Sequence, residues 1–511
     1  MKLISTLFFI TQILVFGQFQ TENELNLPKG LSLSNQLEYS YDTEKKNEIL
    51  ENWLNLDYNY GIFSSGFRFE IFQPNDPNPA IARGKDNYAE IAYKYLKAKI
   101  GNRREGLDIT IGNFYGVIGR GLIFKSYEDR NVRIDNNLLG IYLEGNYSNF
   151  TLKALTGSAA NINDERNDIL HAIDLEFKGI KKIKLGLSLA SNNSENRDDA
   201  ATNLFGARFS SNFSFFDFHT EYALKTNNDI KESIVKNERN IIGRALYSNL
   251  NFYYEDFSVV TEYKYYDNFN FTSQDGTVQY NTSPSVIRDY SYILLNRHPH
   301  ALNQNNEKGF QVEGNYVFSD HTNMTLSYGL TQTIGEGSFF NQVIGIDQKS
   351  RNQLKEMFGQ IHHKWNNKLK SIFTFGYNEE ASSNTQNITP IIENTYSFNE
   401  TNSVRLILEH QFTKNDFNEE KYYSDVLTLE FFHSPDLSIS FVGEMKTSEP
   451  VKDKIERKYW RFVNTSYKIN DYIDISLLVG SRQAGNICIG GVCRYEPEFE
   501  GIELKMLTRL Y

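Results

Sequence analysis

Two cysteines near the end of the chain are close enough in sequence to form a disulfide bond. Cys488 and Cys493 are separated by Ile-Gly-Gly-Val, and the two glycines can supply the positive φ angles of a hairpin tip. In an exported protein, two cysteines this close most simply form one disulfide bond, which would stabilise the tip by about 2 kcal/mol. A metal site is the alternative, but a structural zinc site needs four ligands, and two thiolates without a neighbouring histidine supply only half of them. The spacing also differs from the Cys-x-x-Cys of redox sites.

The stretch from Gly116 to Asn137 is dense in charge, and its glycines break the strand pattern. In a membrane β-barrel, which the strand pattern described below predicts, such a run cannot face lipid, because an arginine at the membrane midplane costs roughly 2 to 4 kcal/mol. The run must therefore face the lumen of the barrel or belong to an external loop. Structural salt bridges between loop and wall are one interpretation, and a charged constriction or ligand site in a channel is the other. The candidate residues are Arg120, Lys125, Glu128, Asp129, Arg130, Arg133 and Asp135.

A second long link runs from Asn270 to Lys308, and at roughly 39 residues it far exceeds the usual connection. It contains the apolar segment Tyr290 to Leu295, so we expect it to fold inward or against a rim. Its candidate lumen residues are Arg288, Arg297, His298 and His300. The two histidines could bind a metal, but without a nearby carboxylate or cysteine we expect ordinary loop chemistry and no metal site.

No enzyme motif is present: there is no Gly-x-Ser-x-Gly, no His-Glu-x-x-His and no nucleotide-binding loop. We therefore expect no catalytic residues and no cofactor. The formal net charge of −11, without a basic cluster, argues against nucleic acid as a partner.

The beginning of the chain predicts export. Lys2 precedes an apolar run from Leu3 to Phe16 and the small residue Gly17, which is the pattern of a signal peptide over residues 1–17. The run is too short for a membrane helix, and no later segment approaches one. We expect a short periplasmic segment over residues 18–30, followed by one domain over residues 31–511.

Apolar residues alternate with polar ones along many short stretches of the chain, as in Ile183 to Leu189, and this period of two predicts β-strands. Short turns such as Ser148-Asn149 and Glu255-Asp256 alternate with long polar links. Aromatic residues, including Tyr147 and Trp365, flank the short turns. This pattern is typical of a large, closed, antiparallel up-and-down transmembrane β-barrel, with about 24 strands in a range of about 22 to 26.

The last eleven residues, Gly501 to Tyr511, continue the alternation to the final residue. Ile502, Leu504 and Met506 share one face, with Glu503 and Lys505 on the other. Closing a barrel pairs the last strand with the first, which we expect near residues 31–41.

Three stretches resemble a known family: "NFYGVIGRGLIFKSYEDRNVRIDNNLLG" from Asn113, "YILLNRHPHALNQNNEKGFQ" from Tyr292 and "GNICIGGVCRYEPEFEGIELKMLTRLY" from Gly485. They are similar to an outer-membrane β-barrel family of Gram-negative bacteria that is catalogued only as a domain of unknown function. The resemblance implies the barrel fold and the outer-membrane location. It supplies no substrate, partner or catalytic residue.

We expect a channel or transporter whose lumen is constricted by inward-folded segments. A structural or partner subunit of a larger outer-membrane assembly is the alternative, and a membrane hydrolase is the third hypothesis. The expected partners are outer-membrane lipid, the barrel assembly machinery and, under the second hypothesis, other outer-membrane proteins.

Overall fold

The computed structural model describes residues 27–73, 87–161, 163–194, 201–227, 241–345, 349–417, 419–449, 456–489 and 492–511. The expected signal peptide, residues 1–17, lies outside the described residues, as does most of the segment 18–30. In the described ranges, no helix is long and apolar enough to cross a membrane.

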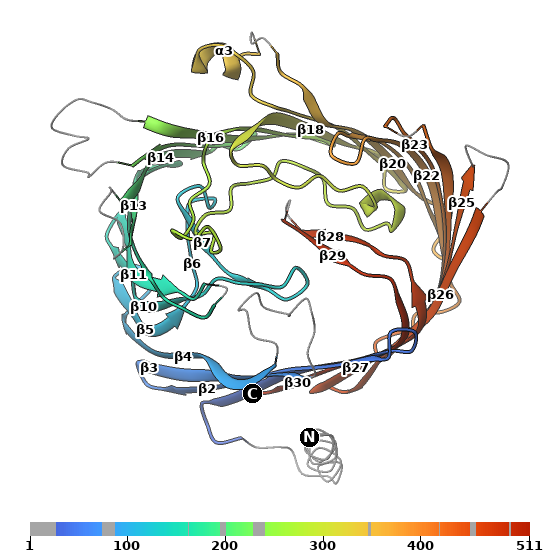
Figure 1. Cartoon of the computed structure of the whole chain (residues 1–511), viewed down its shortest axis with the longest axis horizontal. Coiled ribbons are helices and arrows are strands. Elements are labelled where there is room, and N and C mark those ends of the chain that lie inside the picture. Colours follow the sequence, from blue (N-terminus) through green and yellow to red (C-terminus); the bar gives the residue numbers. More distant parts are fainter. Residues whose placement is uncertain are drawn as a thin grey trace.

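The wall is one antiparallel sheet of 24 strands, which confirms the predicted fold class (Figure 1). In chain order the wall strands are β1 (Leu31–Asp42), β2 (Asn47–Tyr60), β3 (Phe63–Gln73), β4 (Tyr88–Gly101), β5 (Gly106–Phe114), β10 (Leu138–Tyr147), β11 (Phe150–Ala159), β12 (Asp168–Ile180), β13 (Ile183–Ser194), β14 (Thr202–Asn212), β15 (Phe216–Thr226), β16 (Ile241–Tyr254), β17 (Phe257–Asp267), β18 (Asn306–Ser319), β19 (Thr322–Gln332), β20 (Asn352–Lys364), β21 (Leu369–Glu380), β22 (Thr385–Ser397), β23 (Asn402–Asn415), β24 (Lys421–His433), β25 (Leu437–Glu449), β26 (Glu456–Asn470), β27 (Ile473–Arg482) and β30 (Phe499–Leu510).

The sheet closes between its first and last strands. β1 pairs with β2 on one side and with β30 on the other, and Leu37 lies opposite Met506 in the β1–β30 register. Each wall strand therefore has a neighbour on both sides, so that no backbone edge is left unpaired. The predicted closure of the barrel by the C-terminal strand is confirmed.

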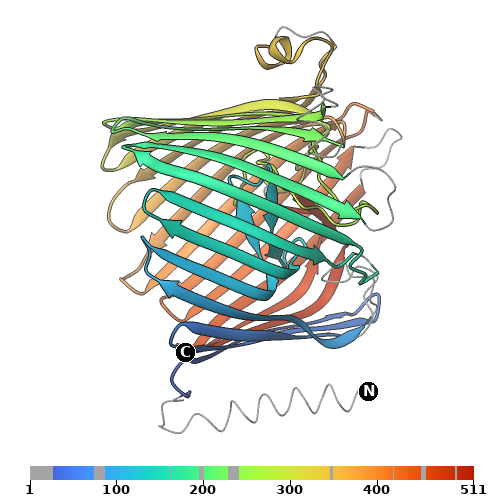
Figure 2. The same cartoon turned by 90° about the vertical axis from the view of Figure 1, so that its left-hand side faces the viewer.

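Short turns and long links lie on opposite rims of the barrel, and the strands between them are tilted (Figure 2). The tight turns include those joining β10 to β11 and β16 to β17. The second long link was misplaced at its end: Lys308 pairs with Tyr265 and Gln332 in the wall, so the link comprises residues 268–305. The prediction extended the link as far as Lys308, because an alternating pattern does not show at which residue a strand begins.

The two faces of the wall differ in the sense expected of a membrane protein. On β12, Ile173 and Leu175 point outward and are 44 % and 42 % exposed, whereas Asp174 between them points inward and is 2 % exposed. A soluble barrel would bury the apolar side chains and expose the acid. The outward apolar face is suited to lipid.

Aromatic side chains mark the rim of the short turns. Tyr147, Tyr254, Phe318 and Trp365 lie at or beside these turns, and all are more than half exposed. Tyrosine and tryptophan at the end of an apolar band are typical of a membrane–water interface.

The remaining elements are short. They are the hairpins β6 (Gly116–Ile118) with β7 (Phe124–Ser126), β8 (Glu128–Asp129) with β9 (Ile134–Asp135), and β28 (Gly485–Ile489) with β29 (Val492–Glu496), the 3-10 helix η2 (Leu294–Asn296) and the helix α3 (Phe339–Val343). α3 lies outside the outline of the barrel, and the hairpins β6–β7 and β28–β29 lie within it (Figure 1).

Candidate lumen constriction

Among the links that fold into the barrel are the two candidate segments, namely segment 115–137 between β5 and β10 and segment 268–305 between β17 and β18; the hairpin β28–β29, between β27 and β30, also lies inside (Figure 1). The two segments touch each other: the amide of Lys125 donates to the carbonyl of Tyr280 at 2.9 Å, and Asn281 Nδ2 donates to the carbonyl of Leu122 at 3.0 Å. Both candidate regions from the sequence therefore lie together inside the wall.

An apolar cluster joins both segments to the inner face of the wall. Leu122 and Phe124 from one segment and Phe269 and Phe271 from the other are fully buried in it. Some of the inward side chains of the wall are small here, because β12, β13, β15 and β16 each contribute an alanine. Fully burying a leucine or phenylalanine side chain contributes about 1.5 to 3 kcal/mol, so this packing holds the segments in place.

Two wall glycines make room for this packing. A Cβ added to Gly206 on β14 would lie 2.8 Å from Ile123 Cδ1 of segment 115–137. A Cβ at Gly376 on β21 would collide with the side chain of Leu295 in segment 268–305. The wall is thus shaped to receive side chains from both segments.

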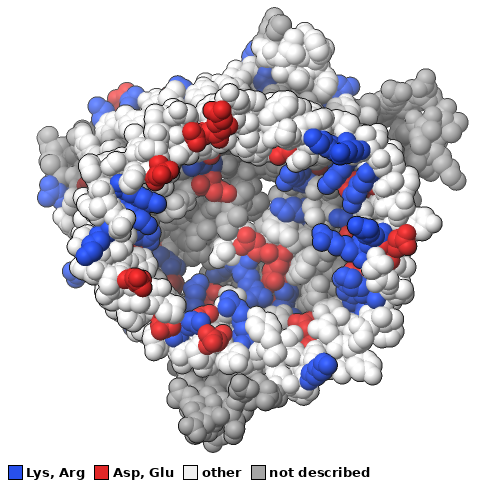
Figure 3. All heavy atoms as spheres, turned by 180° about the vertical axis from the view of Figure 1, so that it is seen from behind, with Lys and Arg blue, Asp and Glu red and all other residues white. Residues whose placement is uncertain are grey.

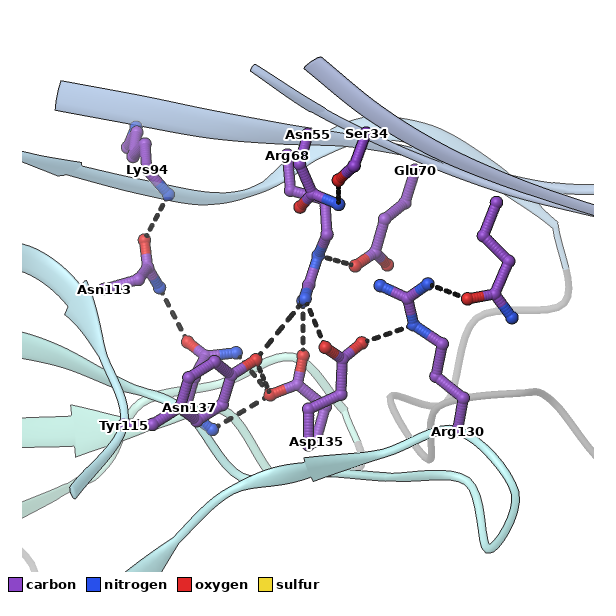
Figure 4. Close-up of polar contacts among 12 residues, drawn as sticks. Ser34, Asn55, Arg68, Glu70, Lys94, Asn113, Tyr115, Arg130, Asp135 and Asn137 are labelled. Carbon is purple, nitrogen blue, oxygen red and sulfur yellow. Dashed lines mark hydrogen bonds and ion pairs between the residues drawn. The ribbon is translucent and has the colours of Figure 1, made fainter. Parts of the chain in front are cut away.

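Arg68 on β3 is the main polar anchor of segment 115–137 (Figure 4). Its guanidinium lies 2.8 Å from Glu128 and 2.6 Å from Asp135, and it also pairs with Glu70 of its own strand. These three carboxylates offer oxygens within 4.8 Å of one another, a spacing that would suit a metal. Here the arginine supplies the positive charge, and the arrangement is the salt-bridge interpretation of the charged stretch.

Arg130 and Lys125 are also engaged within the barrel. Arg130 lies 2.9 Å from Glu128, donates to Gln36 at 2.8 Å and stacks over Trp53 at 4.5 Å. Lys125 lies 4.5 Å from the centre of the Tyr127 ring, and burial lowers the pKa of its ammonium group. Both cations are therefore held by the wall or by their own segment.

The other candidates of this stretch are placed differently. The amide of Arg120 donates to Glu221 of β15 at 2.7 Å, and the residue itself is exposed. Asp129 accepts the amide of Asn131 at 3.0 Å. Arg133, with a φ of 54°, lines a cavity of about 260 Å³ together with Arg130 and Arg482.

Segment 268–305 is fastened along a row of inward-pointing glutamates, which we call the glutamate row: Glu313, Glu356, Glu393, Glu409 and Glu444, on β18, β20, β22, β23 and β25. Residues 288–292 of the segment meet the row through side chains. Arg288 pairs with Glu313, Tyr290 donates its hydroxyl to Glu356 at 3.4 Å, and Tyr292 donates to Glu393 at 3.0 Å.

Around η2, backbone amides of the segment make the contacts with the glutamate row. The amides of Ile293 and Leu294 donate to the two carboxylate oxygens of Glu409 at 3.2 and 2.8 Å, and Leu294 is fully buried against Val426 and Val442. Arg297 then lies 2.6 Å from Glu444. Residues 288 to 297 of the segment are therefore bound in order by glutamates of β18, β20, β22, β23 and β25.

The two histidines lie in different surroundings. His300 is buried with Nε2 at 2.7 Å from Glu307 and Nδ1 at 3.1 Å from Glu380. Burial disfavours its charge, but these two hydrogen bonds outweigh burial and raise its pKa to about 9. His298 faces Tyr422 at 3.3 Å, and burial together with Arg297 lowers its pKa to about 4.

The expectation that no carboxylate accompanies the histidines is wrong, because the wall supplies two for His300. Lys264 lies 3.1 Å from Glu307, so the carboxylates meet an ammonium and an imidazolium. Both ring nitrogens of His300 are already used in hydrogen bonds. The pair of histidines does not converge on a common point in this arrangement.

Cys488 and Cys493 are direct register partners in the β28–β29 ladder. Their backbones are thus opposite each other, as a hairpin tip requires. The disulfide remains a prediction, and Gly490-Gly491 lie outside the described residues.

Three further polar side chains, which no sequence motif predicted, form a hydrogen-bonded row. Ser210 Oγ on β14 lies 2.7 Å from His219 Nδ1 on β15, and His219 Nε2 lies 2.9 Å from Glu221 Oε1. No sequence motif indicates this arrangement, because Ser210 and His219 are brought together across a strand pair. Arg68 and the glutamate row were missed for the same reason.

The interior is not filled throughout. Figure 3, viewed from the side opposite to Figure 1, shows a hollow surrounded by basic and acidic side chains. The inner wall therefore combines two packed segments with a charged hollow.

Several solved structures are similar in overall shape. The P pilus usher (PapC) translocation pore has 9 % sequence identity and a TM-score of 0.47, covering 94 % of this chain and 99 % of that one. The FrpB iron transporter from Neisseria meningitidis (F5-1 variant) has 10 % identity and a TM-score of 0.42, covering 95 % and 83 %. The siderophore receptor PirA from Pseudomonas aeruginosa has 10 % identity and a TM-score of 0.43, covering 95 % and 81 %.

No curated protein matches the chain in sequence. One family does: its sequence model matches residues 1–510, which is nearly the whole chain. The protein therefore belongs to the family of unknown function DUF6029.

Proposed function

We propose that the protein is a channel or transporter of the Gram-negative outer membrane whose lumen is constricted by segments 115–137 and 268–305. The observation that carries the proposal is the way both segments are bound to the inner wall, through the apolar cluster, Arg68 and the glutamate row. A wall of 24 strands encloses more space than its own side chains fill. Segments held inside it would decide what passes.

The location follows from the same wall. Its outward side chains are apolar and its sheet is closed, and closed barrels are the β-structures that satisfy every backbone group in lipid. Barrels of this kind are typical of bacterial outer membranes. The expected signal peptide would deliver the chain there.

The decisive experiment removes a segment without disturbing the wall. Asp267 and Asn306 are directly paired, so an Asn-Gly turn can replace segment 268–305 and leave the β17–β18 ladder intact. We expect a several-fold larger single-channel conductance in planar bilayers. The matched control shortens the β19–β20 link, residues 333–351, because Gln332 and Asn352 are also paired and α3 lies outside the barrel.

Equal currents from the wild type and both variants would contradict the constriction. A complete absence of current from correctly folded protein, with or without segment 268–305, would favour the partner-subunit hypothesis. In the same bilayers, neutral replacements of Arg120, Arg130 and Arg133 should shift selectivity toward cations, because positive charge at a constriction favours anions.

One observation favours the hydrolase as a second candidate, namely the line formed by Ser210, His219 and Glu221. A histidine between a hydroxyl and a carboxylate can take the proton of a nucleophilic serine. The ring nitrogens are used in the order opposite to that of the serine-protease triad, since Nδ1 faces the serine. Glu221 also accepts the amide of Arg120, a contact that serves the docking of segment 115–137.

A fluorophosphonate reagent distinguishes a catalytic role of Ser210, His219 and Glu221 from a purely structural one. Stoichiometric labelling that disappears in Ser210→Ala would establish a reactive serine. The control is Ser188→Ala, since Ser188 also points inward and donates to a carboxylate, Asp174, at 2.6 Å. Absence of labelling in the wild type leaves the line as a structural hydrogen-bond network.

A further inference from the structure

The link between β19 and β20, which carries α3, folds away from the lumen. In Figure 1 the helix lies outside the wall, and in Figure 2 it lies alongside the wall, at the top of the view, and not beyond the rim of the long links. The structure describes residues 333–345 and 349–351 of this link, which we call the outer strap. The surroundings of the outer strap therefore differ from those of the two inward segments.

An aromatic ring of α3 packs on tyrosines of the wall. The ring of Phe339 lies 5.1 Å from that of Tyr265 on β17 and 5.8 Å from that of Tyr222 on β15. Tyr265 points outward, because Tyr266 beside it donates its hydroxyl to a segment inside the barrel and successive side chains of a strand alternate between its faces. Tyr265 is only 3 % exposed. The outer strap therefore covers part of the outward face of the wall.

Polar groups on the same outward face are bound by the outer strap. The hydroxyl of Tyr263 donates to the carbonyl of Val343 at 3.3 Å, and Lys308 Nζ donates to the carbonyl of Gln342 at 3.3 Å. The guanidinium of Arg244 lies 5.5 Å from the centre of the same α3 ring that packs on the tyrosines. Charged groups on a lipid-facing wall cost free energy, so these contacts stabilise a wall that carries them.

The outer strap also holds its own shape. At its two ends, the amide of Thr333 donates to the carbonyl of Arg351 at 2.9 Å, and the amide of Arg351 donates to the hydroxyl of Thr333 at 3.0 Å. The side chain of Gln342 accepts the amide of Gly335 at 3.1 Å. The hydroxyl of Ser338 caps the start of α3. Docking and internal hydrogen bonds therefore fix which side of α3 faces away from the wall.

The side of α3 that faces away from the wall is apolar. Phe340 and Ile344 are four residues apart, so they lie on one face of the helix, and they are 67 % and 48 % exposed. Leu187, which points to lipid from the wall strand β13, is exposed to a similar extent, at 65 %. The exposed face of α3 thus continues the apolar outward surface of the wall.

We propose that the outer strap is a lipid anchor, in which α3 inserts Phe340 and Ile344 among the acyl chains of the leaflet at the long-link rim. A helix with one apolar face lies at the boundary between headgroups and acyl chains, with that face buried by about 5 to 10 Å. The tyrosines beneath α3 are residues typical of the same boundary. The anchor rests on the membrane location of the barrel and does not depend on transport through it.

The test places tryptophan probes on the strap of the purified full chain in phosphatidylcholine vesicles. The chain has 3 tryptophans; Trp365→Phe removes the exposed one, and Trp53 and Trp460 are 3 % and 6 % exposed. Phe340→Trp and Ile344→Trp are then made in this background. Lipid brominated on its acyl chains quenches tryptophan emission from within the bilayer, and iodide quenches it from the water.

Two control variants define the limits of the measurement. Leu187→Trp reports on the lipid-facing wall, and Asp471→Trp reports on water at the short turn between β26 and β27, where the carboxylate side chain is 87 % exposed. We expect brominated lipid to reduce the emission of Phe340→Trp and Ile344→Trp about as much as that of Leu187→Trp. Iodide should strongly quench Asp471→Trp alone.

Heat-modifiable gel migration verifies that each variant is folded, and Ile344→Trp decides if Phe340→Trp does not fold. Iodide quenching of the strap variants as strong as that of Asp471→Trp, without an effect of bromine, would overturn the anchor. Protection from both quenchers would also overturn it, since the side chains would then pack on protein. If brominated lipid fails to quench Leu187→Trp as well, the membrane location fails together with the anchor, whereas failure of the strap variants alone leaves the location intact.

Discussion

The docking of segment 268–305 can be tested at a single side chain, Leu294. It is fully buried against Val426 and Val442, and its carbonyl accepts Gln411 Nε2 at 2.8 Å. Leu294→Ala shortens a side chain of the segment and leaves every wall residue unchanged. The loss of packing therefore falls on docking and not on the barrel.

The expected magnitude follows from the burial. Replacing a fully buried leucine by alanine costs about 2 to 5 kcal/mol, since the removed methyl groups leave a cavity. At about 3 kcal/mol, the ratio of undocked to docked segment rises about 100-fold, because about 1.4 kcal/mol corresponds to a factor of ten.

Limited proteolysis measures this ratio. Trypsin can cut after Arg297, whose guanidinium is held by Glu444 in the docked segment. When reclosing is fast, the cleavage rate follows the population of the open form. We expect cleavage of Leu294→Ala to be about 100-fold faster than that of the wild type.

The matched control is Leu427→Ala. Leu427 adjoins Val426 on β24 but points outward and is 40 % exposed, so its loss should leave docking unchanged. If Leu294→Ala is cut at the wild-type rate while both variants keep the heat-modifiable migration of a barrel, packing of Leu294 does not hold the segment and the reasoning fails.

The remaining predictions concern location, the cysteines and pH. The protein should fractionate with the outer membrane and migrate faster on an unheated denaturing gel than on a heated one; recovery as a soluble periplasmic protein would contradict the barrel in lipid. Cys488 and Cys493 should resist alkylation until they are reduced, and immediate labelling of both thiols would rule out the disulfide. Because the pKa of His300 is raised to about 9, its stabilising contacts with Glu307 and Glu380 are complete below its ordinary value of about 6.5 and are lost as the pH rises through 9. Tryptic cleavage, normalised to a peptide substrate, should therefore accelerate between pH 6.5 and 9.5 in the wild type and not in His300→Gln; equal profiles would contradict the assignment.

The architecture was predictable because lipid imposes a simple rule on the wall. Outward positions are mostly apolar, so residues such as Ile173 and Leu175 reveal the strand by their period of two. Hairpin turns and long links then distinguish the rims. The end of a strand is less visible, and Lys308 was assigned to a link because a charged residue on the wall near a rim looks like a loop residue.

The candidate site was predictable only in part. The two inward segments could be recognised because their composition does not fit a lipid-facing wall. Their partners could not, because Arg68 and the glutamate row lie on strands far away in sequence, where an inward glutamate looks the same whether it faces water or a docked segment. Glu307, seven residues after His300, was the one carboxylate that sequence proximity could have indicated.

The burial of the glutamate row bears on how the lumen would open. Glu356, Glu409 and Glu444 are 7 %, 4 % and 8 % exposed, although an inward carboxylate of an empty barrel would be hydrated. Burying a carboxylate without a partner costs several kcal/mol, so these residues are compatible with the fold because the segment brings Tyr290, the η2 amides and Arg297 to them. Displacement of the whole segment would break these contacts together with the packing of Leu294. Under the proposed channel function, the geometry therefore favours a segment that stays docked when the lumen opens.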